Sequence, residues 1–228
     1  MKYVIFDLDD TLLDFQAAEQ ASLTTILTRY HVPDLAVAKR VYLTHNRQVW
    51  QQIEHGADRD QLLDQRFQIV FAKLGITVDG PKVQHEYNDL LGQGFQVLPG
   101  VDSMLTKLKS AGLVLLIGTN GVQDTQLNRL AGSGLAPQFD HVFISESVGF
   151  AKPDRRFFDA IFTTYPDLSP HNAVMVGDSL ASDIAGAVNV GLPSIWFNPH
   201  HLANLSDVHP TATVTNFDQL QQLLLSKV

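Results

Sequence analysis

The segment that decides the fold is YVIFDLDDTL, which occupies residues 3–12. Its apolar residues, Tyr3 to Phe6, are followed at once by Asp7 and, two positions later, by Asp9. A continuous apolar run, rather than an alternating one, is typical of a strand buried on both faces, as in a parallel sheet. The segment therefore predicts an inner strand of a parallel sheet with acidic side chains at its carboxyl end.

Further short apolar runs predict the other strands of this sheet, at residues 113–117, 142–144, 173–176, 194–197 and 212–214. Apolar residues at helical spacing lie between or after them, at 101–108, 157–162, 184–188 and 217–225. Gly112 and Gly191 follow two of these stretches, as expected where helices end. Because strands and helices alternate, the fold class is predicted to be α/β, with right-handed crossovers.

Residues 15–96 interrupt this alternation, because they contain no convincing strand. They carry apolar stripes at helical spacing instead, one at Leu63, Phe67, Val70, Phe71 and Leu74, another at Val83, Tyr87, Leu90 and Leu91, and a longer one marked by Val37, Val41, Trp50 and Ile53. We therefore expect an all-helical insert. The predicted division is an α/β core of residues 1–14 and 97–228 and a helical domain of residues 15–96.

Composition and charge exclude several classes of protein. The 228 residues carry a net charge of −8, which argues against binding to nucleic acid or to an anionic membrane surface. The absence of cysteine excludes disulfides and Cys-ligated metal centres. The apolar run at the N-terminus is too short for a signal peptide, and no run approaches the roughly 18 residues of a membrane span. We therefore expect a cytoplasmic enzyme; the sequence does not indicate its oligomeric state.

Polar side chains should converge at one edge of the sheet. Asp7, Thr119 and Asp178 each follow a predicted strand, and the carboxyl ends of parallel strands lie along the same edge. Asp9 and Asp183 lie close to this edge in sequence, so four carboxylates would gather there and repel one another unless a cation sat among them. Hard oxygen ligands favour Mg²⁺ over zinc. The sequence thus predicts a magnesium site.

Four ordered segments connect these residues to a known family. They are DLDDTL at 7–12, TNG at 119–121, KPD at 152–154, and Gly177-Asp178 together with Asp183. In this order and at these strand ends, the segments resemble the motifs of the haloacid-dehalogenase superfamily. The resemblance implies a Rossmann-like three-layer core with a parallel sheet, and identifies the helical insert with the C1-type cap domain of that family.

The same resemblance implies roles for the acidic residues. Asp7 would be the nucleophile that forms an aspartyl-phosphate, which divides hydrolysis into two easier steps. Asp9 would protonate the leaving oxygen and then accept a proton from the attacking water. The Mg²⁺ cofactor would be held by the Asp7 carboxylate, the Asp9 backbone carbonyl and Asp178, with Asp183 bound directly or through water.

The phosphate group of the substrate is assigned to three further residues by the resemblance. The Thr119 hydroxyl and the Asn120 backbone N–H would bind phosphate oxygens, and Lys152 would neutralise them. Lys152 is needed because three carboxylates and a dianionic phosphate exceed the charge of one Mg²⁺ ion. The expected partner is therefore a small phosphorylated substrate.

The residues also favour one reaction over its alternatives. Dehalogenases of the superfamily lack the second aspartate of the first motif, so Asp9 favours phosphoryl transfer. The segments DLDDTLLDF (7–15), TNGV (119–122), GFAKP (149–153) and WFNP (196–199) resemble the pyrimidine 5′-nucleotidase branch, which implies a 5′-nucleotidase that hydrolyses UMP, dUMP or dTMP. A β-phosphoglucomutase-like phosphomutase, a sugar-phosphate phosphatase and a catalytically inactive binding module remain alternatives. Aromatic residues of the insert offer surface for a nucleoside: Phe15, Tyr42, Trp50 and Phe95.

Overall fold

The computed structural model describes residues 1–227, and within them six parallel strands form one sheet in the order β3-β2-β1-β4-β5-β6. The strands are β1 (Tyr3–Phe6), β2 (Val114–Thr119), β3 (His141–Ile144), β4 (Ala173–Gly177), β5 (Ser194–Phe197) and β6 (Ala212–Val214). Every strand that the sequence predicts is therefore present. Strand β1 pairs with β2 on one side and β4 on the other, so the ends of these three strands share one edge.

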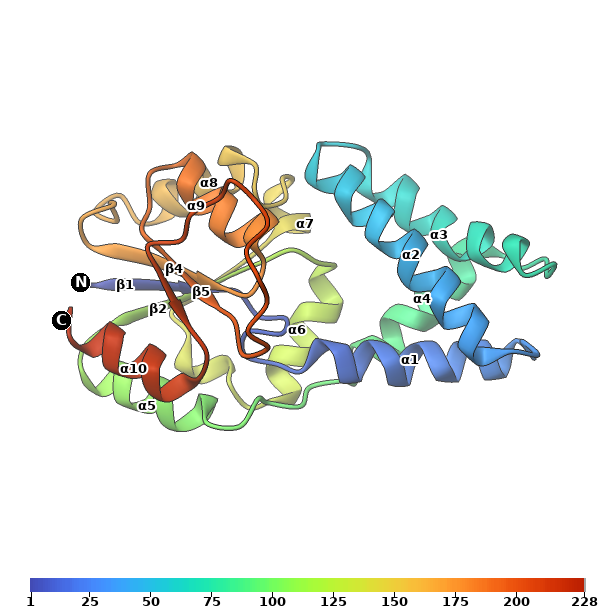
Figure 1. The fold of residues 1–228 in the computed structure, drawn as a ribbon, viewed down its shortest axis with the longest axis horizontal. Coiled ribbons are helices and arrows are strands. Elements are labelled where there is room, and N and C mark those ends of the chain that lie inside the picture. Colours follow the sequence, from blue (N-terminus) through green and yellow to red (C-terminus); the bar gives the residue numbers. More distant parts are fainter. Residues whose placement is uncertain (228) are drawn as a thin grey trace.

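Helices cover both faces of the sheet and give the three-layer α/β core (Figure 1). These elements are α5 (Val101–Ser110), α6 (Gln123–Gly132), the 3₁₀ turn η1 (Ala136–Gln138), α7 (Ser145–Val148), α8 (Arg155–Thr164), the π-helical turn η2 (Leu180–Ile184), α9 (Ala185–Asn189) and α10 (Phe217–Leu225). Alternate residues of β1 point to opposite faces, as the pleat requires. Val4 and Phe6 pack in the cluster that contains α5 and α10, and Ile5 packs with Phe157 and Phe158 of α8.

The all-helical part, here called the cap, consists of α1 (Phe15–Arg29), α2 (Leu35–Glu54), α3 (Arg59–Lys73) and α4 (Gly80–Leu91) (Figure 1). Each of these helices begins after an aspartate whose side chain accepts a hydrogen bond from the backbone N–H three residues later: Asp14, Asp34, Asp58 and Asp79. The helices pack around a core of their own, which includes Leu23, Phe67, Phe71 and Tyr87. The cap thus has its own N-terminal signals and its own apolar core.

The apolar stripe predicted for α2 differs from the buried face of that helix. Val37 is exposed and Val41 and Trp50 are half-buried, whereas the buried residues are Ala38, Tyr42, Asn46, Val49 and Ile53. The reason is Asn46, a polar residue that the apolar pattern cannot place inside. Its side chain is buried because it binds Glu19 and Arg66 on neighbouring helices.

The two chain segments that join the cap to the core run side by side. Asp14 donates its backbone N–H to Gln96, and Leu98 donates to Leu12, both over 2.9 Å. The linkers are therefore tied to each other at the base of the cap. Among residues 1–227, no helix combines the length and the apolar character that crossing a bilayer would require.

Candidate active site

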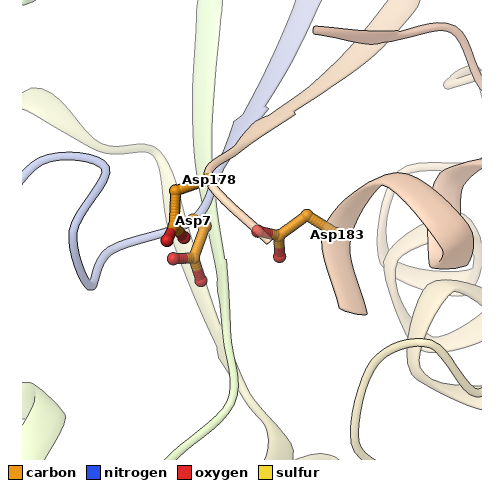
Figure 2. Close-up of side chains that lie close together, drawn as sticks. All are labelled: Asp7, Asp178 and Asp183. Carbon is orange, nitrogen blue, oxygen red and sulfur yellow. The ribbon is translucent and has the colours of Figure 1, made fainter. Parts of the chain in front are cut away.

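Three carboxylates meet at the end of the sheet: Asp7 after β1, Asp178 after β4 and Asp183 in η2 (Figure 2). One carboxylate oxygen of each lies within 4.8 Å of those of the other two. Asp7 and Asp183 are buried, and Asp178 is half-buried. The convergence follows from the parallel sheet, because β1 and β4 are adjacent and in register at Phe6 and Val176.

Asp183 reaches this cluster because a glycine ends β4. A Cβ atom at Gly177 would lie 2.1 Å from Oδ2 of Asp183, so any other residue would displace the carboxylate. The same oxygen accepts a 3.0 Å hydrogen bond from the Ser179 backbone N–H, which closes the tight turn into η2. Gly177 is therefore part of the site, because its lack of a side chain leaves room for the Asp183 carboxylate.

Lys152 supplies the positive charge of the cluster. Its Nζ donates to Oδ1 of Asp7 and to Oδ1 of Asp183, both at 2.7 Å, and also to the Gly118 carbonyl. Asn120 fixes the backbone that carries Lys152: its side-chain N–H₂ donates to the Lys152 carbonyl, and its Oδ1 accepts from the Lys152 N–H, each over 2.9 Å. The side chain of Asn120 thus positions the lysine.

Burial makes the negative charge of this cluster costly. Burial raises the pKa of Asp7 to about 8, although Lys152 opposes the shift. Burial and the neighbouring carboxylates of Asp183 and Asp7 raise the pKa of Asp178 to about 9. Burial disfavours the charged form of Lys152, but the attraction of Asp183 and Asp7 outweighs it and raises the pKa of Lys152 above its ordinary value. One ammonium does not balance three carboxylates, and their hard oxygen donors fit a divalent cation.

Asp9 lies beside this cluster and has partners of its own. Its Oδ2 accepts a 2.9 Å hydrogen bond from Nε2 of Gln126, and its Oδ1 accepts from Nη1 of Arg129. The same Gln126 nitrogen donates to the Thr119 hydroxyl over 2.8 Å. Because the Thr119 oxygen accepts this bond, its own O–H remains available to donate. Of the four carboxylates expected together, three therefore cluster, and Asp9 is held apart by α6.

Gln126 and Arg129 are site residues that the sequence analysis did not identify. Arg129 is fully buried; its Nε donates to the Gly94 carbonyl of the linker over 2.8 Å, and its guanidinium lies 5.4 Å from the Phe15 ring. One arginine of α6 thus contacts Asp9, one cap linker and the first cap residue. The only sequence signal was the spacing of three residues, which places Gln126 and Arg129 on one face of a helix just after the TNG segment.

A cavity of about 320 Å³ extends from the carboxylates into the cap. Its core end includes Asp7, Asp9, Asn120, Lys152, Asp178 and Asp183, and its cap end includes Phe15, Trp50, Leu63, Arg66, Gln84, Tyr87, Asn88 and Leu91. Phe15 and Trp50 thus line it, as the sequence suggested. Tyr42 is instead buried in the cap core, and Phe95 lies outside the cavity with 43% of its surface exposed. Thr119 is fully buried and is not among the residues that line the cavity.

Comparison with known proteins shows the family to which this chain belongs. The family model of haloacid dehalogenase-like hydrolases matches residues 1–191. The chain is 38% identical over 224 residues to pyrimidine 5′-nucleotidase PynA of Streptococcus pneumoniae, covering 98% of this chain and 94% of that protein. It is 32% identical to pyrimidine 5′-nucleotidase YjjG of Escherichia coli, with 97% of each chain covered. A crystal structure of YfnB from Bacillus subtilis bound to magnesium has a TM-score of 0.90 and 34% identity, covering 98% of both chains.

Proposed function

The chain belongs to the haloacid dehalogenase-like hydrolases, and we propose that it is a Mg²⁺-dependent phosphatase of pyrimidine nucleoside 5′-monophosphates. The observation that carries this proposal is the single cavity that joins the carboxylate cluster and Lys152 to a cap end with apolar walls and amide and guanidinium groups. Two relatives that match nearly the whole chain, PynA and YjjG, are pyrimidine 5′-nucleotidases.

In the first proposed step, a carboxylate oxygen of Asp7 attacks the phosphorus of the bound monoester. The bond between phosphorus and the nucleoside oxygen breaks, and that oxygen takes a proton from Asp9 as the nucleoside leaves. In the second step, Asp9 accepts a proton from water, whose oxygen attacks the aspartyl-phosphate and releases inorganic phosphate and the free Asp7 carboxylate. Asp9 and Asp7 line the same cavity, which supports these two roles.

Three groups are proposed to bind the phosphate. Lys152 is already held against Asp7, so its charge lies where the phosphoryl group would be transferred. The Thr119 hydroxyl is the second proposed donor, because Gln126 engages its lone pair and leaves its O–H free. Its side chain is buried outside the cavity lining, so this contact requires a local shift when the phosphate binds. The backbone N–H of Asn120 is the third proposed donor.

Mg²⁺ is proposed to be held by Asp7, Asp178 and the Asp9 backbone carbonyl, with Asp183 as a direct or water-mediated ligand. The oxygens of Asp183 already accept from Lys152 and Ser179, so this carboxylate also orients the lysine. When bound, the ion would neutralise charge on the phosphate oxygens and on the carboxylates. The magnesium in the YfnB structure supports the choice of Mg²⁺ as the metal.

Residues 15–96 are proposed to act as a separate domain that closes over the substrate. Besides the two linkers, a 2.8 Å ion pair joins Arg59 at the start of α3 to Glu146 of α7. Closure would exclude bulk water from the phosphoryl group during transfer. The two residues of this ion pair do not line the cavity, so it joins the cap to the core away from the carboxylate cluster.

A β-phosphoglucomutase-like activity is the second candidate function, and the residue that supports it is Arg66. Within the described residues it is the cation that the cap contributes to the cavity wall, and a sugar-phosphate mutase needs cations for a second phosphate. The binding of Arg66 to Asn46 and Gln84 on its own side of the cavity favours the nucleotidase, because these contacts leave it fewer donors for a phosphate.

The test is a comparison of kcat/KM for UMP, dUMP and dTMP with that for AMP, glucose 6-phosphate and β-glucose 1-phosphate in Mg²⁺. The pyrimidine nucleotides should be preferred; activity should vanish in chelator and return with Mg²⁺ or Mn²⁺ but not with Ca²⁺, whose larger coordination sphere would misplace Asp7. Preference for a sugar phosphate, or conversion of β-glucose 1-phosphate to its 6-phosphate, would instead establish the second candidate. Full activity in excess chelator would overturn the metal assignment.

A further inference from the structure

A chain of buried polar side chains crosses the cap and ends at the cavity. Asn46 of α2 donates to Glu19 of α1 over 3.1 Å and accepts from Nη1 of Arg66 over 2.6 Å. Arg66 of α3 donates through Nε and Nη2 to Oε1 of Gln84 on α4, over 3.1 and 2.9 Å, and Gln84 in turn donates to Oδ1 of Asn88 over 2.8 Å. All four cap helices therefore contribute to one network.

The network holds the guanidinium of Arg66 in a fixed place. The side chain is 3% exposed, and its central carbon lies 5.1 to 5.4 Å from the ring centres of Tyr42, Phe67 and Tyr87. Aromatic faces and hydrogen-bonded amides leave the planar group little freedom to rotate. Arg66 is thus a pre-oriented donor on the cavity wall.

Several N–H groups of this network have no partner among residues 1–227. Arg66 carries five N–H groups and uses three of them, which leaves one on each terminal nitrogen. The Asn88 side chain uses its oxygen to accept from Gln84, which leaves its N–H₂ group. Arg66 and Asn88 both line the cavity, whereas the acceptor Glu19, which binds Asn46, does not. The carboxylate of Glu54 at the end of α2 lines the cavity as well. The cap therefore offers the cavity two hydrogen-bond donors between apolar walls, Arg66 and Asn88, besides the carboxylate of Glu54.

We propose that Arg66 and Asn88 determine base specificity by donating hydrogen bonds to the ring carbonyl oxygens of a pyrimidine nucleotide. This inference rests on the proposed nucleotidase function and deepens it. Uracil and thymine carry two carbonyl oxygens, at C2 and C4, which match a set of donors. Cytosine replaces the C4 oxygen with an amino donor, and adenine has no carbonyl, so each leaves a donor of the cap unpaired. Phe15, Trp50, Leu63 and Leu91 supply the apolar walls for the ring.

The experiment compares UMP with ribose 5-phosphate, which has the sugar and the phosphate but no base. Arg66→Met and Asn88→Leu remove donors at similar side-chain length. Each should lower the ratio of kcat/KM for UMP to that for ribose 5-phosphate by about ten- to a hundredfold, the effect of losing one or two hydrogen bonds to the base. Arg47→Met, on the exposed surface of α2, is the matched control and should leave the ratio unchanged.

The stronger test is a variant that should shift the base preference from UMP toward CMP. Asn88→Asp replaces the donor with an acceptor while keeping the oxygen that Gln84 binds, so it should raise the ratio of kcat/KM for CMP to that for UMP by about tenfold or more. Asn88 is half-buried, so this variant and Asn88→Leu also serve if Arg66→Met does not fold, as thermal unfolding would show.

The outcomes separate this inference from the proposed function. A wild-type enzyme that does not prefer pyrimidine nucleotides to AMP and ribose 5-phosphate would overturn the nucleotidase itself. A wild-type enzyme with that preference, whose Arg66 and Asn88 variants retain the wild-type ratios for UMP, CMP and ribose 5-phosphate, would overturn only the assignment of these two residues.

Discussion

Nζ of Lys152 lies 2.7 Å from Oδ1 of Asp7, and both side chains are removed from solvent. The proposed nucleophile is thus oriented by a buried cation before substrate arrives. Lys152 comes from a loop 145 residues away in sequence, which Asn120 holds in place at the end of β2. Orientation of Asp7 therefore depends on contacts between three separate segments of the core.

Lys152→Met should lower kcat by at least about 10²- to 10³-fold, because it removes both the cation on the phosphate and the group that orients Asp7. It should also destabilise the metal-free protein by about 3 kcal/mol, because buried carboxylates lose their partner, and Mg²⁺ should recover part of this loss. Steady-state kinetics and urea unfolding with and without Mg²⁺ measure both effects. Lys107→Met, on the exposed side of α5, is the control; equal behaviour of the two variants would contradict the assignment.

Gly177→Ala tests the space at the end of β4. The added Cβ would lie 2.1 Å from the Asp183 carboxylate, so that carboxylate must move away from Lys152. We expect kcat to fall at least tenfold with the circular dichroism spectrum preserved. Gly92→Ala is matched to it, because its Cβ would meet atoms only at 3.4 Å or beyond. Wild-type turnover by Gly177→Ala would show that the position of Asp183 is not needed.

Arg129→Met should release Asp9 from the side chain that holds it against α6. If Arg129 positions the general acid, kcat for UMP should fall about ten- to a hundredfold, whereas p-nitrophenyl phosphate, whose leaving group needs little protonation, should lose less. Arg155→Met, at an exposed position of α8, controls for loss of charge. An equal loss for both substrates would mean that Arg129 acts on the fold alone.

Glu19 should make the stability of the cap depend on pH. Burial raises the pKa of Glu19 from 4.5 to about 7, against the attraction of Arg66, so the folded protein holds this proton more tightly than the unfolded chain does. Its contribution to stability is therefore complete below about pH 4.5 and is lost as the pH rises to about 7.

Glu19→Gln mimics the protonated side chain and should remove this pH dependence. Compared with wild type, the variant should gain little stability at pH 4.5 and up to about 3 kcal/mol at pH 8. Urea unfolding at both pH values measures the difference, with the exposed Asp207→Asn as the control. A gain that is the same at both pH values would contradict the buried, proton-linked state of Glu19.

The sheet and its site could be predicted because their signals are local in sequence. Asp7 and Asp178 directly follow buried apolar runs, and parallel pairing brings such strand ends to one edge without further information. Asp183 could be placed nearby because it follows Asp178 in the turn after β4. These residues needed only the order and type of the elements.

The cap contacts could not be predicted, because they depend on how helices pack. Arg66 and Asn46 lie on buried faces that an apolar pattern assigns to hydrophobic residues, and only their mutual hydrogen bonds make that burial tolerable. In the sequence, Arg129 likewise resembles an ordinary polar residue of an amphipathic helix. Only the structure shows that it binds Asp9 and the Gly94 carbonyl. Tyr42 and Phe95 had the right chemistry for the cavity, but α2 turns the first into the cap core and the linker leaves the second outside it.

The most direct test of the mechanism is to identify the residue that carries the phosphoryl group during turnover. Wild-type protein turning over UMP with Mg²⁺ is quenched in acid, digested and analysed by peptide mass spectrometry, with Asp7→Asn treated in parallel. The proposed mechanism predicts one phosphoryl group on Asp7 in the wild-type N-terminal peptide and none in the variant, which should also lack turnover. Turnover by Asp7→Asn at a rate near that of wild type, or a phosphoryl group found on another residue, would contradict it.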